Sequence, residues 1–155
     1  MNLYLLRHGE AEPQHYDDSL RALTSHGKQE VVDVARQFAK LDIKLTASFY
    51  SPFTRTTQTC SLFLSEYGST VKSEPLILLT PSHRALQVLA FLRSLQAQQV
   101  LLVTHNPLVS ELLAVLTNTE IDSMHIFSTS ELVAVRCHDC TAGGGEMAFS
   151  LQAQV

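Results

Sequence analysis

Two histidines in this sequence stand in the same setting, each just after a short apolar run. Arg7 and His8 follow the apolar residues 3–6, and His105 comes after residues 100–103 and one threonine. Unbroken apolar runs of this length are typical of strands that are covered on both faces, as in a parallel sheet. Open α/β sheets bind their ligands at the carboxyl ends of such strands. The two histidines are therefore candidates for one shared site.

An arginine stands in an unusual place for a cation. Arg55 lies in the first turn of a helix that we expect to follow Ser51 and Pro52, where another predicted strand, residues 47–50, ends. The amino end of a helix already carries partial positive charge, so a cation there indicates an anionic partner. The alternative is an ion pair with a nearby acid on the surface. Ser51 is interpreted as a turn former and not as a ligand.

Together these residues indicate phosphoryl chemistry. If the three strands run parallel, Arg7, His8, Arg55 and His105 face one crevice. Guanidinium groups match tetrahedral oxyanions through paired hydrogen bonds, and a phosphoryl group is their natural guest. A neutral histidine is a competent nucleophile near neutral pH. Because the arginines, and His105 if it is protonated, already meet the charge, we expect no metal and no other cofactor.

The composition restricts the class of protein. Hydrophobic residues make up 45% and charged residues 17%, which is typical of a globular domain. The formal net charge of −4 argues against general binding of nucleic acid. No apolar run approaches the roughly 18 residues of a membrane helix, and no signal segment precedes the first strand. The three cysteines, an odd number, fit a reducing cytoplasm. The length predicts one domain over residues 1–155.

The order of the predicted elements defines the fold class. Short apolar runs predict strands at residues 3–6, 47–50, 71–74, 100–103, 132–135 and 147–151. Apolar residues at helical spacing predict helices that begin after Thr24 and at residues 52–67, 84–95 and 107–116. The last two strands flank a triple glycine at 143–145 and form a hairpin. We therefore expect a three-layer α/β/α domain with a mixed, mostly parallel central sheet.

A polar, turn-rich stretch at residues 11–22 connects the first strand to the first helix. It holds three acids, Glu12, Asp17 and Asp18, close to Arg21. We interpret these acids as part of a solvated loop.

Three motifs in order resemble those of the histidine phosphatase (phosphoglycerate-mutase-like) superfamily. Residues 6–11, LRHGEA, resemble its RHG signature, residues 51–59, SPFTRTTQT, its second motif, and residues 103–105, VTH, its third. The length, the RALT run at 21–24 and the LTP run at 79–81 resemble the small SixA-type phosphohistidine phosphatases in particular. The resemblance covers residues 1 to about 116 and, more loosely, 128–130. It implies a phosphoglycerate-mutase-like fold.

The resemblance also implies roles for single residues. His8 takes the phosphoryl group covalently, while Arg7, Arg55 and His105 bind its oxygens and stabilise the transition state. Arg21 is a further candidate for substrate binding, with a surface ion pair as the alternative. The implied substrate is phosphohistidine on a signalling (histidine phosphotransfer) protein, and we expect a monomer in the cytoplasm.

One departure from the family pattern bears on the substrate. Many members carry a carboxylic general acid in the loop after the third strand, but residues 76–83 hold no carboxylate, and Glu74 is interpreted as solvated. A phosphohistidine needs less help, since its leaving imidazole is protonated near neutral pH. The short span 75–83 also leaves no room for a lid insertion, and its apolar residues 76–79 look like core. We therefore expect an open pocket and a preference for N–P over O–P bonds.

Other functions stay open at this point. The chain is alternatively a phosphatase of small phosphate esters, or a carrier module that stores phosphate on His8 without hydrolysing it. A metal or redox module on Cys137 and Cys140 is a weaker alternative, because no second Cys/His pair stands at zinc spacing.

Overall fold

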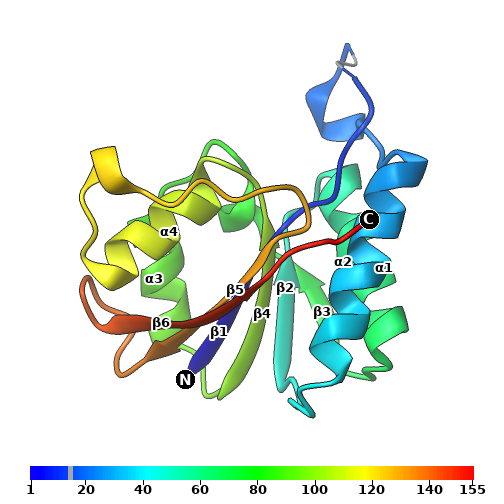
Figure 1. Cartoon of the computed structure of the whole chain (residues 1–155). Helices are drawn as coiled ribbons and strands as arrows, with labels where there is room; N and C mark the ends of the chain where they lie inside the picture. Colours follow the sequence, from blue (N-terminus) through cyan, green and yellow to red (C-terminus); the bar gives the residue numbers. More distant parts are fainter. Residues whose placement is uncertain (14–15) are drawn as a thin grey trace.

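Six strands form one mixed sheet in the order β3-β2-β4-β1-β5-β6 (Figure 1). The computed structural model describes residues 1–13 and 16–155. The predicted polar loop at 11–22 includes residues 14 and 15, so that part of the prediction, with His15, lies outside the described residues. The strands are β1 Asn2–Arg7, β2 Ala47–Tyr50, β3 Ser73–Pro75, β4 Gln99–Thr104, β5 Leu132–Cys137 and β6 Gly145–Leu151.

Helices cover both faces of the sheet and make three layers. In Figure 1, α1 (Ser25–Ala39) and α2 (Thr54–Tyr67) lie on one face, and α3 (Ala85–Arg93) and α4 (Leu108–Thr117) lie on the other. Three short 3₁₀ helices occur in the connections: η1 Asp18–Leu20, η2 Ile77–Leu79 and η3 Ile121–Ser123. None of the helices in the described residues is both long and apolar enough to cross a membrane. The predicted α/β/α architecture is confirmed.

The strand directions bring the predicted site residues to one edge of the sheet. β4 lies between β1 and β2 and runs parallel to both, with Leu102 opposite Leu5 on one side and Phe49 on the other. β3 is also parallel to β2, whereas β5 is antiparallel to β1, and β6 to β5. The carboxyl ends of β1, β2 and β4 therefore meet at the same edge, as the sequence predicts.

The apolar run of β1 is unbroken because helices pack on both of its faces. Side chains alternate along a strand. Leu3 and Leu5 accordingly join the buried cluster under α3 and α4, while Tyr4 and Leu6 join the cluster under α1 and α2. All four side chains are buried. Burial on both faces fixes the position of β1, and Arg7 and His8 lie at its carboxyl end.

The element boundaries differ from the predicted ones in small ways. Thr24 caps α1 as predicted, accepting a hydrogen bond from the amide of Gly27 at 2.9 Å. Pro107 is the residue before α4 and not its first residue. β3 begins at Ser73 and not at residue 71 as predicted. It is an edge strand, and it extends only as far as β2 pairs with it, over Ser73–Pro75.

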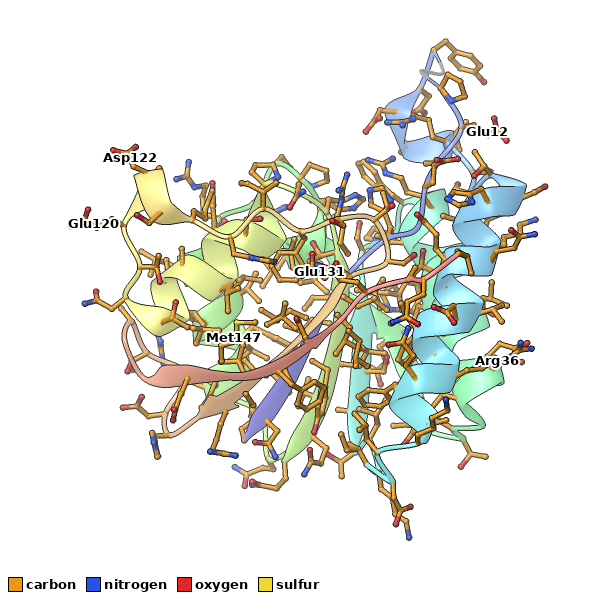
Figure 2. All side chains as sticks on the ribbon, viewed as in Figure 1. Glu12, Arg36, Glu120, Asp122, Glu131 and Met147 are labelled. Carbon is orange, nitrogen blue, oxygen red and sulfur yellow. The ribbon has the colours of Figure 1, made fainter. Side chains whose placement is uncertain are left out.

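A loop between β1 and α1 projects from the carboxyl edge of the sheet (Figure 1). We refer to its described part, residues 11–13 and 16–23, as the projecting loop. Its base is closed by a bridge between Ala11 and Leu23 and by the hydrogen bond from the amide of Glu12 to the carbonyl of Ala22, at 2.8 Å. Glu12 points outward from it in Figure 2. Closing the base ties the loop to the strand end that carries His8.

Candidate active site

His8 is held at the end of β1 with one ring nitrogen unprotonated. Its Nδ1 lies 2.7 Å from the carbonyl oxygen of Gly9. Because a carbonyl only accepts, Nδ1 carries the hydrogen, and Nε2 of the neutral ring keeps a lone pair. Burial lowers the pKa of His8 to about 4, and the positive charges of Arg55, Arg7 and Arg21 act in the same direction against the Gly9 hydrogen bond. His8 is therefore a neutral imidazole at pH 7, as its predicted role of nucleophile requires.

Gly9 fixes the position of the histidine that precedes it. A side chain at residue 9 would place its Cβ 2.7 Å from the carbonyl oxygen of Gly27 in α1, so only glycine allows this approach. The amide of Gly9 donates to Thr59 Oγ1 at 3.1 Å, and this hydroxyl in turn donates to the carbonyl of Arg55 at 2.7 Å. The RHG segment is thereby tied to both α1 and α2.

Arg55 lies against the nucleophile. Its Nε donates to Nε2 of His8 at 3.3 Å from the first turn of α2, and the side chain is buried. Its two terminal nitrogens both contact Asp18: Nη1 donates to the main-chain carbonyl at 2.7 Å, and Nη2 lies 3.1 Å from carboxylate Oδ2. The structure therefore shows the alternative for Arg55, an ion pair with a nearby acid, and an anionic ligand of Arg55 stays a prediction.

Asp18 is exposed, as the interpretation of a solvated loop requires, but it also pairs with Arg55 of the site, which the sequence did not indicate. Its side chain is 56% exposed, yet its carboxylate bridges Arg55 and Arg21, with Oδ1 3.1 Å from Nη1 of Arg21. Burial alone would raise the pKa of Asp18, but the hydrogen bonds from Arg21 and Arg55 outweigh it and lower the pKa. Asp18 is therefore an ionised member of the site. The polar loop gave no periodicity that marks one acid among three as inward-facing.

Arg21 lies behind Asp18 on the projecting loop. Besides Asp18, it contacts the main-chain carbonyl of Glu12, to which Nε donates at 2.8 Å. Both contacts are within the loop, as the surface ion-pair alternative requires. A direct role of Arg21 in substrate binding stays a prediction.

Arg7 is held by a carbonyl group that comes from far along the chain. Its Nη1 donates to the carbonyl of Phe127 at 2.7 Å, and the side chain of Asn106 donates to the same oxygen at 3.0 Å. Burial lowers the pKa of Arg7, while Glu30 and Glu131 counteract this. Nε of Arg7 is buried and has no hydrogen-bond partner among the described residues. Unpaired buried donors are rare, so this one is a candidate to bind an oxyanion.

A buried glutamate shapes the segment that supplies this carbonyl. Glu131 lies inside the molecule near the start of β5 (Figure 2). Its carboxylate accepts hydrogen bonds from the amide of Ser128 and from Nε2 of His125, both at 2.8 Å. These bonds fix the turn next to Phe127. The sequence offered no signal for this role.

His105 lies beside His8 and is held by Ser51. The two imidazole rings have centroids 5.3 Å apart, and Nε2 of His105 lies 2.8 Å from the Oγ of Ser51. Ser51 therefore does more than form a turn, because it joins the end of β2 to the end of β4. Burial lowers the pKa of His105 to about 2, and the neighbouring charges of His8 and Arg55 add to the shift. His105 is thus neutral here, contrary to the protonated form that the sequence analysis allowed.

The four predicted catalytic residues therefore lie at one edge of the sheet. They provide a nucleophilic nitrogen, two guanidinium groups and a second imidazole, which is a donor set for a tetrahedral oxyanion. In the part of the chain that the structure describes, no group of three or more His, Cys, Asp or Glu side chains is arranged to hold a metal ion.

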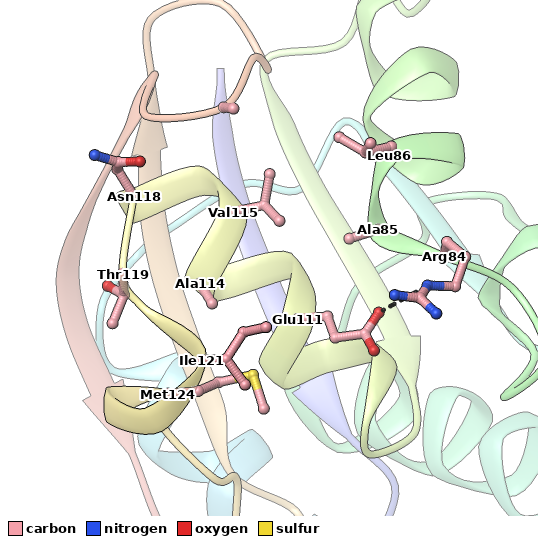
Figure 3. A pocket seen from close by; sticks show the side chains of 11 residues that line it. Arg84, Ala85, Leu86, Glu111, Ala114, Val115, Asn118, Thr119, Ile121 and Met124 are labelled. Atoms are coloured by element: carbon pink, nitrogen blue, oxygen red, sulfur yellow. Dashed lines mark ion pairs between the residues drawn. The ribbon is translucent and has the colours of Figure 1, made fainter.

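A groove of about 500 Å³ lies elsewhere, between α3 and α4 (Figure 3). It is largely apolar and is bordered by an ion pair between Arg84 and Glu111, 3.6 Å apart. Its lining includes none of the four predicted catalytic residues. The groove therefore has no part in the chemistry described above.

Cys137 and Cys140 lie away from the catalytic residues. Cys137 ends β5 next to Met1, whose carbonyl accepts from its amide at 2.8 Å, at the opposite end of β1 from His8. Both thiols are free and buried. Burial raises the pKa of Cys137 to about 12 and also raises that of Cys140, so both stay protonated.

Comparisons with known proteins agree with this geometry. Residues 3–77 match the model of the histidine phosphatase superfamily (branch 1). The chain is 32% identical over 142 residues to the phosphohistidine phosphatase SixA of Escherichia coli (strain K12), covering 87% of this chain and 84% of that protein.

Solved structures share the fold. The protein histidine phosphatase SixA complexed with tungstate has a TM-score of 0.89 at 28% identity, over 98% of this chain and 97% of that one. A putative alpha-ribazole-5′-P phosphatase from E. coli (strain K-12, substrain MG1655) has a TM-score of 0.78 at 15% identity, over 99% and 97% of the two chains. At this low identity the second likeness shows the fold alone.

Proposed function

The chain belongs to the histidine phosphatase superfamily, and on that premise we propose that it removes phosphate from phosphohistidine on a signalling protein. The observation that carries this proposal is the contact between Nε of Arg55 and the unprotonated Nε2 of His8, at 3.3 Å. It supports the proposal because donors of Arg55 are within reach of oxygens on a phosphoryl group attached to His8. The name of the E. coli relative and the tungstate complex of SixA support the same chemistry.

In the first half of the reaction, Nε2 of His8 attacks phosphorus. A bond forms between phosphorus and Nε2, the bond from phosphorus to the substrate imidazole breaks, and that imidazole takes up a proton from water. Arg7 and Arg55 donate to the phosphoryl oxygens, and His105 donates from its ring N–H. The Nε–H of Arg55, which donates to Nε2 before the reaction, donates to a phosphoryl oxygen once Nε2 has bonded phosphorus.

In the second half, water attacks the phosphorus of phospho-His8. The P–N bond breaks, inorganic phosphate leaves, one proton passes to solvent, and the neutral His8 is regenerated. Splitting one displacement into two makes each step easier. The hydrogen bond from Nδ1 to the carbonyl of Gly9 keeps the ring in one orientation throughout both steps.

The protonation state of the site favours an N–P bond. The carboxylate next to Arg55 belongs to Asp18, and its lowered pKa makes it a poor proton donor at neutral pH. An alkoxide leaving group needs such a donor, whereas a departing imidazole is protonated by water near neutral pH. The site therefore suits phosphohistidine better than a sugar phosphate.

The surroundings of the crevice favour a protein as substrate. Three aliphatic side chains are well exposed on three segments at the carboxyl edge of the sheet: Leu20 at 49%, Ile77 at 61% and Ile126 at 66%. The interpretation of residues 76–79 as core is therefore wrong for Ile77, whereas Leu79 is buried. Ile126 directly precedes the residue whose carbonyl binds Arg7. Exposed apolar groups around a polar site are typical of a surface that contacts another protein. We expect a monomeric, cytoplasmic enzyme that meets its partner through these groups.

The test compares kcat/KM for a phosphohistidine-bearing phosphotransfer domain, a free phosphohistidine peptide, an aryl phosphate and a ribose 5-phosphate ester. We expect the domain to be the best substrate and the esters to be poor ones. The triple variant Leu20→Ser, Ile77→Ser, Ile126→Ser should raise KM for the domain and leave the peptide unaffected. A preference for an ester would instead identify a metabolic phosphatase. Stable phospho-His8 without release of phosphate would identify a carrier.

A further inference from the structure

Asp18 binds the guanidinium group of Arg55 at its two terminal nitrogens. The guanidinium group has two edges with paired donors: the end, formed by Nη1 and Nη2, and the side, formed by Nε and Nη2. Asp18 occupies the end, with its main-chain carbonyl 2.7 Å from Nη1 and its carboxylate 3.1 Å from Nη2. One residue thus meets both terminal nitrogens.

Because Asp18 binds the end of the guanidinium group, the side edge of Arg55 faces the site of reaction. Nε points at Nε2 of His8, 3.3 Å away, which is the atom that receives phosphorus in the proposed reaction. Rotation of the guanidinium about its last bonds would break both contacts to Asp18. The side edge is therefore held toward the nucleophile before any substrate arrives.

We propose that Asp18 is a positioning residue that fixes the side edge of Arg55 toward the phosphoryl group. This inference rests on the proposed function and deepens it. Asp18 acts through Arg55 and contacts neither the nucleophile nor the transferred group. Replacement of Asp18 should then lower kcat more than it lowers the affinity for an anion. A misaligned Arg55 still binds an anion but no longer matches the transition-state geometry.

Arg21 completes the arrangement. It binds the second carboxylate oxygen of Asp18 at 3.1 Å and anchors to the carbonyl of Glu12 at 2.8 Å. The carboxylate of Asp18 thus bridges the buried Arg55 and Arg21 on the projecting loop.

A competing explanation assigns the opposite effect to the same contact. If Asp18 merely occupied the anion site, its removal would raise both anion affinity and turnover. Positioning predicts a loss of turnover and of affinity for a transition-state analogue, with little change in the binding of inorganic phosphate. The two explanations therefore differ in sign.

The experiment measures kcat, vanadate binding and inorganic phosphate binding for the wild type and Asp18→Asn. Vanadate adopts the five-coordinate geometry of the transition state, whereas phosphate resembles the ground state. We expect kcat and vanadate affinity to fall about tenfold each, the loss of one well-aligned charge-assisted hydrogen bond. Phosphate affinity should change by less than about threefold on the same scale. Glu12→Gln is the matched control, since it removes an exposed carboxylate from the same loop.

The outcomes separate this inference from the proposed function. If the wild type fails to hydrolyse phosphohistidine, the proposed function is wrong, but vanadate binding still tests Asp18. If Asp18→Asn binds vanadate as well as Glu12→Gln does, or turns over faster than the wild type, positioning is wrong. Thermal unfolding verifies that each variant is folded, and Asp18→Ala repeats the test should the Asn variant misfold.

Discussion

Nε of Arg55 lies 3.3 Å from Nε2 of His8, so the predicted oxyanion-binding side chain and the predicted nucleophile are in direct contact. The two residues are 47 positions apart in the chain, and β4 lies between the strands β1 and β2 that precede them. The contact arises because β1 and α2 both present their polar residues at the carboxyl edge. Burial is the main reason why the pKa of His8 is lowered and the ring is neutral, and the positive charge of Arg55 adds to this effect.

Replacing the nucleophile should abolish the reaction and preserve the fold. We expect His8→Asn to lower kcat by at least about a thousandfold, as loss of a nucleophile does in other covalent enzymes. The asparagine amide can still donate to the carbonyl of Gly9, so the strand end should keep its conformation. Acid-labile labelling with radioactive phosphate and thermal unfolding are the measurements. Significant turnover by the folded variant would disprove the covalent mechanism.

Arg55 requires its fork of donors and not only its charge. Arg55→Lys should be nearly as damaging as Arg55→Ala, because an ammonium cannot contact Asp18 with two nitrogens and His8 with a third. Steady-state kinetics of both variants provide the comparison. Lys72→Arg, on an exposed residue far from His8 in sequence, is the control. Wild-type activity in Arg55→Lys would mean that charge alone suffices.

The hydroxyl of Ser51 should matter for catalysis. Ser51→Ala removes the partner of Nε2 of His105, 2.8 Å away, and frees the ring to rotate. We expect a fall in kcat of about five- to tenfold, the usual worth of one neutral hydrogen bond. Ser61→Ala, an exposed serine on α2, should leave kcat unchanged. Equal kinetics for the two variants would show that His105 needs no such support.

The imidazole of His8 should titrate in acid solution. Its pKa of about 4 lies below the ordinary value of 6.5, so the ring stays neutral as the pH falls from 7 and takes up a proton only near pH 4. NMR spectra of the ring protons across this range give the midpoint. In Arg55→Ala the midpoint should rise, because a positive charge that disfavours protonation is removed. A midpoint above 6 in the wild type would contradict the buried, neutral state.

Activity should survive removal of metal ions. The negative charge of the phosphoryl group is met by Arg7 and Arg55, both held in place by protein oxygens. We expect the same kcat before and after dialysis against EDTA. Loss of activity that zinc or magnesium restores would contradict this prediction and would favour a metal site at Cys137 and Cys140.

The strands and the main catalytic residues follow from local sequence patterns. Residues 3–6 and 100–103 are apolar on both faces, and only strands inside a sheet require this. Polar residues directly after such strands are placed by topology alone, since parallel neighbours end at one edge. His8, Arg55 and His105 were predictable for this reason.

The supporting contacts were not predictable from local patterns. Asp18, the carbonyl of Phe127 and the carboxylate of Glu131 come from irregular segments, where no periodicity indicates which way a group points. Their positions depend on how a loop folds back over residues distant in sequence. The hydrogen bond between Ser51 and His105 was not predictable for a related reason, because the two residues lie 54 positions apart.

The central place of β4 has a consequence for shortened chains. β1 and β2 are consecutive strands along the chain, yet β4 lies between them and holds them in register on both sides. A fragment that ends at η2 would retain His8 and Arg55 but would lack the strand that spaces them. Such a fragment could not bring His8 and Arg55 into contact. Adding back residues 80–155 as a separate peptide should therefore restore anion binding and hydrolysis together, which makes activity a sensitive reporter of complementation between the two pieces.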